Sequence, residues 1–410
     1  GKVAGSKGSR EFKSHRLRTN LKEFMSHNNL NSKNKLISES LTVRLNTLAN
    51  QLKSEGKKII NLTAGELDFP TPSYIQQEVK NKLSLNKYTP TTGFLDLRQA
   101  LARQVFKEYK WQVTHQNVAV TSGCKQALFE SLFAILKKDD EVIVPSPDWV
   151  TYRYQIILND AVPVIVPLDK DFDLDVEKIK KAITKKTKAI ILNSPNNPTG
   201  SIYSTKKLLE LKKILKEKDI YVIVDDTYSK IVYDASYKSP ALFMPDERYL
   251  ILVNSFSKSQ ALTGWRIGYV IADKEIINAI SSYQSHTTGN APILSQIAAQ
   301  KILEKGDKTE RFVKVLKKQR DLADKILKNI SGISYTVPKG AFYYFIDVSK
   351  IEKNTEKFCE ELLKSGLALV PGEAFGYPGF VRLSFSTSTK NLIEGIKIFK
   401  KFCENYKNHD

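Results

Sequence analysis

The stretch that decides the fold is Asn254–Val270, which reads NSFSKSQALTGWRIGYV. Apolar runs on either side of it are typical of buried strands, so its polar residues lie between two strands. Lys258 in such apolar surroundings can have a lowered pKa and attack a carbonyl carbon. Arg266 stays charged and can bind an anion such as phosphate with its planar fork. An ordinary surface lysine is the alternative interpretation, because most lysines are exposed.

The wider context of this stretch carries a resemblance to a known family. SFSK followed by TGWRIGY resembles the lysine segment of the fold type I aminotransferases that use pyridoxal 5′-phosphate, and among them the bacterial-type aspartate aminotransferases most closely. The resemblance implies that Lys258 holds the cofactor as a Schiff base and that Ser255 and Arg266 bind its phosphate. It also implies an α/β fold, with a mostly parallel seven-stranded sheet flanked by helices in a large domain and a smaller α+β domain.

Length and composition agree with a two-domain enzyme. The chain has 410 residues, more than one core usually holds, and 41% of them are hydrophobic. No run of about eighteen apolar residues occurs, so we expect no membrane partner. The three cysteines, Cys124, Cys359 and Cys403, fit neither a disulfide framework nor a zinc cluster. They indicate a reducing compartment, so we expect a cytoplasmic protein without a bound metal.

The net charge of +20 raises the question of nucleic-acid binding. Residues 1–35 hold nine Lys/Arg against two Glu, and the remaining charge is spread thinly. No stripe of alternating basic and aromatic residues, helix-turn-helix or zinc-finger spacing is present, so we expect no nucleic-acid partner. Residues 1–36 lack periodicity and are interpreted as a disordered basic leader or an expression remnant, with a trimmed transit peptide as the alternative.

The order of the remaining elements predicts the domain boundaries. Strands and helices alternate through the middle of the chain, whereas the C-terminal strands are grouped with helices. We therefore expect a large cofactor-binding domain at 72–305 and a small domain formed by 37–71 and 306–410. A helix is expected at Lys274–Tyr283, followed by a polar loop at Gln284–Asn290 that resembles the dimer-interface loop of the family.

A phosphate cradle is predicted between the strand Val118–Thr121 and the helix Ala127–Leu136. Free N–H groups and the helix dipole at such a helix start attract anions, although many α/β proteins have similar turns. The turn resembles GGKQALF of the family, and backbone contacts of Gly123, Cys124 and Lys125 to the phosphate are implied. Cys124 replaces the second glycine, and we expect it to fill space rather than to react.

Two further polar segments follow predicted strands. NSPNNPTG at 193–200 is a rigid loop at a strand end, where open α/β sheets bind ligands. It matches the family letter for letter, which implies that Asn197 bonds the cofactor's phenolic oxygen and the substrate carboxylate; a turn without function is the alternative. Asp225 ends a buried strand, where a carboxylate is costly without a cation. By resemblance Asp225 pairs with the pyridine nitrogen and Tyr228 donates to the phenolic oxygen.

Three more site positions rest on the resemblance. Trp149 follows a strand end and is implied to stack on the cofactor ring, with core packing as the alternative; the residue before it is Asp148 in place of the usual tyrosine. Gly65, in AGELDF, is implied to approach the substrate carboxylate. Tyr88 is implied to reach the phosphate of a neighbouring subunit, which predicts a homodimer with shared active sites. Packing at a helix start is the alternative for Tyr88.

Arg382 lies inside the apolar strand Phe380–Phe385, so a carboxylate partner is expected. A structural Asp or Glu could serve, but the resemblance implies the α-carboxylate of the substrate, bound bidentately. Lys125 and Ser40 are implied to recognise a distal carboxylate, which predicts transamination of aspartate with 2-oxoglutarate. Leu36 replaces the lysine tied to prephenate use in the family, so that activity is not predicted. The alternatives are an aromatic or broad-specificity aminotransferase and, less favoured, a cysteine-conjugate β-lyase.

Overall fold

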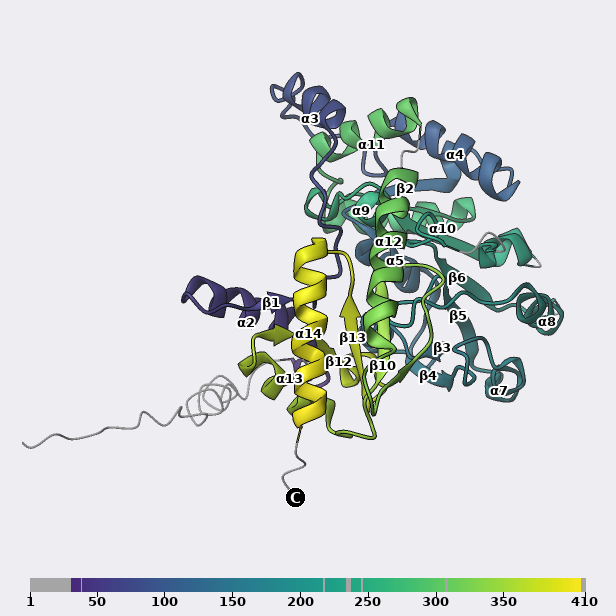
Figure 1. Ribbon diagram of the computed structural model, residues 1–410. Coiled ribbons are helices and arrows are strands. Elements are labelled where there is room, and N and C mark those ends of the chain that lie inside the picture. The colour runs from purple at the N-terminus through teal and green to yellow at the C-terminus, as the bar shows by residue number, and fades with distance from the viewer. Residues whose placement is uncertain are drawn as a thin grey trace, which may run out of the picture. The chain divides into compact units, whose positions relative to one another are not determined.

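The computed structural model describes residues 31–37, 39–216, 218–233, 237–244, 246–306 and 309–406 (Figure 1). The chain divides into two units, 1–38 and 39–410. In the first unit the described residues form the short helix η1 (Ser32–Lys35), where the side chain of Asn31 accepts a hydrogen bond from the Lys33 amide at 2.9 Å. Most of the predicted leader, 1–36, therefore lies outside the described residues.

A seven-stranded sheet forms the centre of the second unit, in the order β2-β8-β7-β6-β5-β3-β4. Its strands are β2 (Val118–Thr121), β3 (Glu141–Ser146), β4 (Val162–Pro167), β5 (Thr187–Asn193), β6 (Tyr221–Asp225), β7 (Leu250–Ser255) and β8 (Gly268–Ile271). Neighbouring strands are parallel from β7 to β4, and β8 runs antiparallel to β7 on one side and to β2 on the other. The mostly parallel seven-stranded sheet predicted from the sequence is confirmed.

Helices cover both faces of this sheet (Figure 1). In β6, Val222 packs in one apolar cluster with residues of α4, α8 and α11, while Ile223 packs in another with residues of α5, α6 and α10. A strand buried on both faces reads as a continuous apolar run, as expected for a parallel sheet. The helices are α3 (Ser73–Lys80), α4 (Leu95–Tyr109), α5 (Cys124–Ile135), α6 (Thr151–Leu158), α7 (Val176–Ala182), α8 (Thr205–Leu215), α9 (Phe256–Ser259), α10 (Lys274–His286) and α11 (Ile293–Lys305).

A second group of strands and helices provides the α+β part of the fold. An antiparallel sheet has the order β12-β13-β10-β9, and β1 pairs in parallel with β11. The strands are β1 (Ile60–Asn61), β9 (Ser334–Tyr335), β10 (Tyr343–Asp347), β11 (Leu367–Ala368), β12 (Val370–Pro371) and β13 (Phe380–Ser384). The helices are α2 (Leu41–Ser54), α12 (Glu310–Leu327), α13 (Thr355–Lys364) and α14 (Thr389–Asn405), and α12 lies beside α14 (Figure 1).

Short 3-10 helices join several of these elements: η2 (His115–Asn117), η3 (Pro240–Phe243), η4 (Glu247–Tyr249), η5 (Thr263–Trp265) and η6 (Gly372–Phe375). Two sequence predictions need correction. Helix α5 begins at Cys124 rather than Ala127 and ends at Ile135. The polar loop begins later than expected, because helix α10 continues to His286. Its last turn is held by Gln284, which is buried and donates to Glu130 Oε2 at 2.8 Å. Helix α13 was not predicted, although Asn354 caps it.

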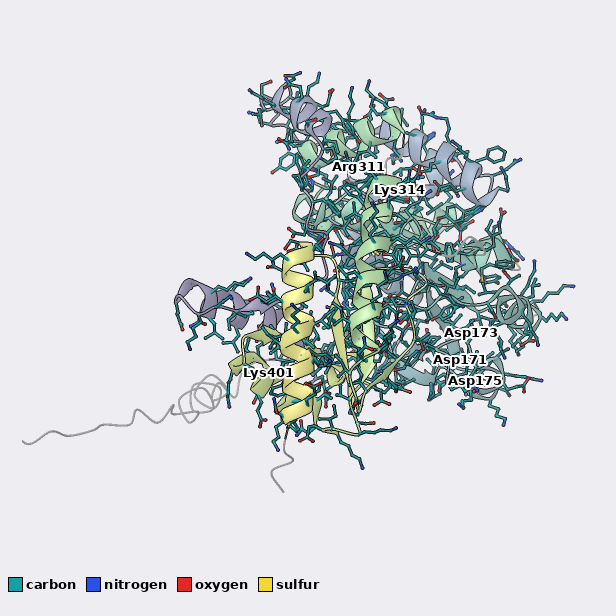
Figure 2. The ribbon with its side chains drawn as sticks, viewed as in Figure 1. Asp171, Asp173, Asp175, Arg311, Lys314 and Lys401 are labelled. Atoms are coloured by element: carbon teal, nitrogen blue, oxygen red, sulfur yellow. The ribbon has the colours of Figure 1, made fainter. Side chains whose placement is uncertain are left out.

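Charged side chains of both signs project from the surface elements (Figure 2). The labelled acidic residues come from the segment between β4 and α7 and the basic ones from α12 and α14: Asp171, Asp173, Asp175, Arg311, Lys314 and Lys401. Among the described residues no helix combines the length and the apolar character needed to cross a membrane. Within the same ranges no group of three or more His, Cys, Asp or Glu residues could hold a metal ion.

Candidate active site

A cavity of about 360 Å³ lies where the carboxyl ends of the parallel strands meet. Loops that leave these ends converge at one edge of an open α/β sheet, which is where such sheets bind ligands. Strands β3, β5, β6 and β7 each deliver residues to it, and β2 delivers the start of α5. The predicted site residues that line the cavity are Gly65, Cys124, Lys125, Trp149, Asn197, Asp225, Tyr228, Ser255, Lys258, Arg266 and Arg382.

Lys258 presents its amine to this cavity from the short helix α9, directly after β7. Its Nζ donates to the carbonyl oxygen of Gly65. Burial lowers the pKa of Lys258 to about 8, and the nearby Arg382 and Arg266 act in the same direction, whereas Glu66 opposes them. Near neutral pH a larger fraction of this amine is therefore neutral than of an exposed lysine, and the neutral form is the nucleophile and the base.

Asp225 ends β6 with both carboxylate oxygens held by donors. The Tyr152 hydroxyl donates to Oδ2 at 2.7 Å, and the Thr227 amide donates to Oδ1 at 3.1 Å. The Cys124 thiol lies 3.6 Å from Oδ1, and burial raises its pKa well above the usual range, so the thiol stays protonated and donates. No lysine or arginine pairs with Asp225 in the part of the chain that the structure describes. The carboxylate is thus oriented but lacks a cation, a costly state for a buried acid.

Arg382, on β13, faces the same cavity and is 2% exposed. Its Nη1 donates to Asn197 Oδ1 and its Nη2 to the Thr63 carbonyl oxygen, both at 2.8 Å. The guanidinium carbon lies 4.3 Å from the ring centre of Tyr343 and 4.9 Å from that of Phe375. Among the described residues no carboxylate pairs with Arg382 and its Nε has no acceptor. This geometry leaves the cation ready for an external carboxylate.

The opposite end of the cavity has the features of an anion cradle. Helix α5 begins at Cys124, and its first amides have no partner inside the helix. Gly123 has φ +86°, and a Cβ there would lie 2.6 Å from Nη2 of Arg266. Gly268 is equally confined, since its Cβ would lie 2.7 Å from the carbonyl carbon of Gly123. The backbone, the guanidinium and Ser255 Oγ are therefore packed closely enough to surround one phosphate.

Lys125 and Trp149 form a pair at the mouth of the cavity. The Lys125 Nζ lies 5.1 Å from the ring centre of Trp149, within the range of a cation–π contact. Burial lowers the pKa of Lys125, and Arg266 adds to this effect. Trp149 also meets Tyr152 edge-on, with ring centres 5.5 Å apart. Trp149 is therefore held between contacts with Tyr152 and with the amine of Lys125.

Three predicted residues do not line the cavity of their own chain. Gly123 lies beside Arg266, directly before α5. Ser40 precedes α2 and makes no capping hydrogen bond with its side chain, while Thr42 and Val43 of that helix line the cavity instead. Tyr88 is 97% exposed. Its predicted role, at the phosphate of a neighbouring subunit, stays a prediction.

Three residues of the site were missed from the sequence. Tyr152 lies in the first turn of α6, and its ring meets that of Trp149, which precedes the helix, edge-on. Tyr343 lies at the start of β10, and its hydroxyl is 2.9 Å from that of Tyr228. Thr63 contributes only its carbonyl oxygen, which no side-chain pattern reveals.

Comparison with known proteins places this geometry among characterised enzymes. The chain is 39% identical over 368 residues to the aspartate aminotransferase of Thermotoga maritima, covering 88% of this chain and 96% of that protein. It is 40% identical over 379 residues to a probable aspartate/prephenate aminotransferase of Aquifex aeolicus, covering 89% and 96%.

Solved structures agree with the sequence comparisons. Aspartate aminotransferase from Thermus thermophilus with maleate superposes with a TM-score of 0.87 at 36% identity, covering 91% of this chain and 99% of that chain. The Thermotoga maritima enzyme also gives a TM-score of 0.87, at 38% identity, covering 92% and 100%. The family described as aminotransferase class I and II matches residues 57–399. The cavity with Lys258, Asp225 and Arg382 therefore sits in a chain that belongs to the class I and II aminotransferases.

Proposed function

We propose that this chain transfers the amino group of aspartate to 2-oxoglutarate, giving oxaloacetate and glutamate. The observation that carries the proposal is one cavity that holds a lysine of lowered pKa, a buried carboxylate and a buried arginine. Among the residues that the structure describes, the carboxylate has no cation partner and the arginine has no carboxylate partner. These groups complement, in turn, an aldehyde, a protonated pyridine nitrogen and an amino acid carboxylate. Relatives named aspartate aminotransferase support the choice of substrate.

Aminotransferases of this family use pyridoxal 5′-phosphate, and the residues of the cavity fit it. The confined glycines Gly123 and Gly268 leave room for a phosphate against the start of α5, with Arg266 beside it. Asp225, with both oxygens oriented, suits the ring nitrogen, and Trp149 suits the ring face. When bound, the cofactor supplies an electron sink for the bond changes at the amino acid's Cα.

The chain's own residues then bind, orient and move a proton. In our proposal Arg382 binds the α-carboxylate bidentately, helped by Asn197, which already accepts from its Nη1. The amine of Lys258 would accept the proton from Cα of the amino acid and hold it on Nζ. Its lowered pKa suits this task, because an efficient base has a pKa near the working pH. Asp225 would hold a proton on the ring nitrogen of the cofactor, and Tyr228 would donate to its phenolic oxygen.

The preference for a dicarboxylate is assigned to Lys125. Its amine lies beside Trp149 and is partly desolvated, so the second carboxylate of a dicarboxylic substrate would supply it with an ion-pair partner. Ser40 or its neighbour Thr42, which lines the cavity, would add a hydroxyl. The Aquifex aeolicus relative is named aspartate/prephenate aminotransferase, but Leu36 lacks the cation that we associate with prephenate.

The division into a large domain at 72–305 and a small domain at 37–71 and 306–410 is also proposed. It assigns the seven-stranded sheet to the first and the antiparallel sheet to the second. A homodimer completes the proposal, with Tyr88 reaching the partner's phosphate. Its 97% exposed side chain supports this assignment. Sedimentation analysis of the wild-type protein tests it, and a monomer at micromolar concentration would contradict it.

The experiment that tests the proposed activity compares three proteins supplied with pyridoxal 5′-phosphate. Wild type, Lys258→Ala and Lys274→Ala are each given aspartate and 2-oxoglutarate, and oxaloacetate is measured. Lys274 is exposed at the start of α10, so its loss controls for removing a lysine. We expect turnover by wild type and Lys274→Ala only. Turnover of aromatic amino acids but not aspartate, or pyruvate release from cystathionine, would replace this proposal with one of its rivals.

A further inference from the structure

Tyr343 is a buried residue of the cavity to which the proposed chemistry gives no task. It is 0% exposed on β10 and lines the cavity. Its hydroxyl lies 2.9 Å from the Tyr228 hydroxyl, and its ring centre lies 4.3 Å from the guanidinium carbon of Arg382. One side chain therefore contacts both the group assigned to the cofactor oxygen and the group assigned to the substrate carboxylate.

The number of available protons decides which of the two hydroxyls, Tyr228 or Tyr343, donates the hydrogen bond between them. Each phenol has one proton to donate, and burial raises the pKa of both tyrosines, so both protons are present. If Tyr228 donates its proton to the phenolic oxygen of the cofactor, that proton is not available for Tyr343. The hydrogen bond between the two hydroxyls must then be donated by Tyr343. A donor that itself accepts a hydrogen bond becomes a stronger donor, because chains of hydrogen bonds polarise one another.

The ring of Tyr343 has a separate effect on Arg382. The guanidinium carbon lies 4.3 Å from the ring centre of Tyr343 and 4.9 Å from that of Phe375. Contact with two aromatic rings restricts the orientation of the fork that binds a carboxylate. The Tyr343 hydroxyl also lies close to Gly65, where an added Cβ would be 3.3 Å from its oxygen.

We propose that Tyr343 is a positioning residue with two separable roles. Its hydroxyl directs the proton of Tyr228 toward the cofactor, and its ring orients Arg382 toward the substrate carboxylate. The inference rests on the proposed function, which supplies the cofactor and the amino acid. It goes beyond that function, since Tyr343 acts through two other side chains and its two roles predict different defects.

Two substitutions separate the roles, and the next residue on the strand gives the control. Tyr343→Phe keeps the ring and removes the hydroxyl, whereas Tyr343→Leu removes both. Tyr344→Phe removes a hydroxyl from an equally buried tyrosine whose hydroxyl donates to the Arg320 carbonyl oxygen at 2.8 Å. Each protein is loaded with pyridoxal 5′-phosphate. The visible absorbance of the bound cofactor is titrated against pH, and the Kd of maleate, a dicarboxylate, is measured by equilibrium titration.

We expect the absorbance midpoint of Tyr343→Phe to move upward by roughly a few tenths of a pH unit, because a weaker donor stabilises the anionic phenolic oxygen less. The Kd of Tyr343→Phe for maleate should stay within about twofold of wild type, whereas Tyr343→Leu should raise this Kd about fivefold or more. Tyr344→Phe should match wild type in both. An unchanged midpoint in Tyr343→Phe, or an equal loss of maleate affinity in both Tyr343 variants, overturns the inference about Tyr343. Either result leaves the proposed function standing. A wild-type protein that binds no cofactor overturns the proposed function with it.

Discussion

The ion pair between Arg153 and Asp148 predicts a loss of stability that depends on pH. Asp148 is 1% exposed, and Arg153 Nε lies 3.1 Å from both of its carboxylate oxygens. Arg153 Nη2 also donates to Ser146 Oγ at 3.0 Å. The guanidinium rests against Gly376, where a Cβ would overlap it. Arg153→Met fills similar space but leaves the buried carboxylate without its cation.

The magnitude follows from burial. Removing one partner of a buried pair costs about 3–5 kcal/mol, and because the Arg153 side chain is 22% exposed we expect about 2–4 kcal/mol. Burial raises the pKa of Asp148 and Arg153 opposes this, so the substitution raises that pKa further. A carboxyl whose pKa is higher in the folded state binds more protons there, so the variant gains stability as pH falls and loses it as pH rises.

Thermal unfolding at pH 5 and pH 8 measures the effect. The matched control is Lys178→Met, which breaks the exposed pair of Lys178 with Asp175, and such pairs contribute at most about 1 kcal/mol. Asp148→Asn combined with Arg153→Met should recover part of the loss, because no buried charge remains unpaired. The reasoning is refuted if Arg153→Met costs no more than the control, or if its deficit is the same at both pH values.

Three further predictions concern the cavity. Gly123→Ala should weaken pyridoxal 5′-phosphate binding about tenfold or more, because its Cβ would lie 2.6 Å from the neighbouring arginine. Gly56→Ala, also at positive φ but with open space around it, should bind the cofactor normally in the same absorbance titration. Tyr152→Phe removes the 2.7 Å donor to Asp225 and should lower kcat about tenfold with little change in KM, and an unchanged kcat would contradict this. Lys125→Gln should raise KM for aspartate about tenfold but not for alanine, and an equal rise for both would remove its role in specificity.

The sequence predicted those parts of the site that follow a strand directly. Asp225 ends β6, and Lys258 comes just after β7, so a buried apolar run and the polar residue behind it predict both places. The central sheet followed from the same runs, since each parallel strand is apolar on both faces. Helix α13 was missed because its helical spacing is short and lies among strands.

Contacts between residues that lie far apart in the chain could not be predicted from the sequence. Tyr152 reaches Asp225 across 73 positions and Tyr343 reaches Tyr228 across 115. Arg382 donates to the Thr63 carbonyl oxygen across 319 positions. The packing of distant strands determines which residues meet. In the sequence, a tyrosine at the start of a strand fits a residue of the apolar core equally well.

The central claim is the covalent attachment of the cofactor to Lys258. The most direct measurement is borohydride reduction of the wild-type protein with bound pyridoxal 5′-phosphate, which makes the link permanent, followed by digestion and mass spectrometry. We expect the added cofactor mass on the peptide that carries Lys258. Labelling of surface lysines without Lys258 would contradict it.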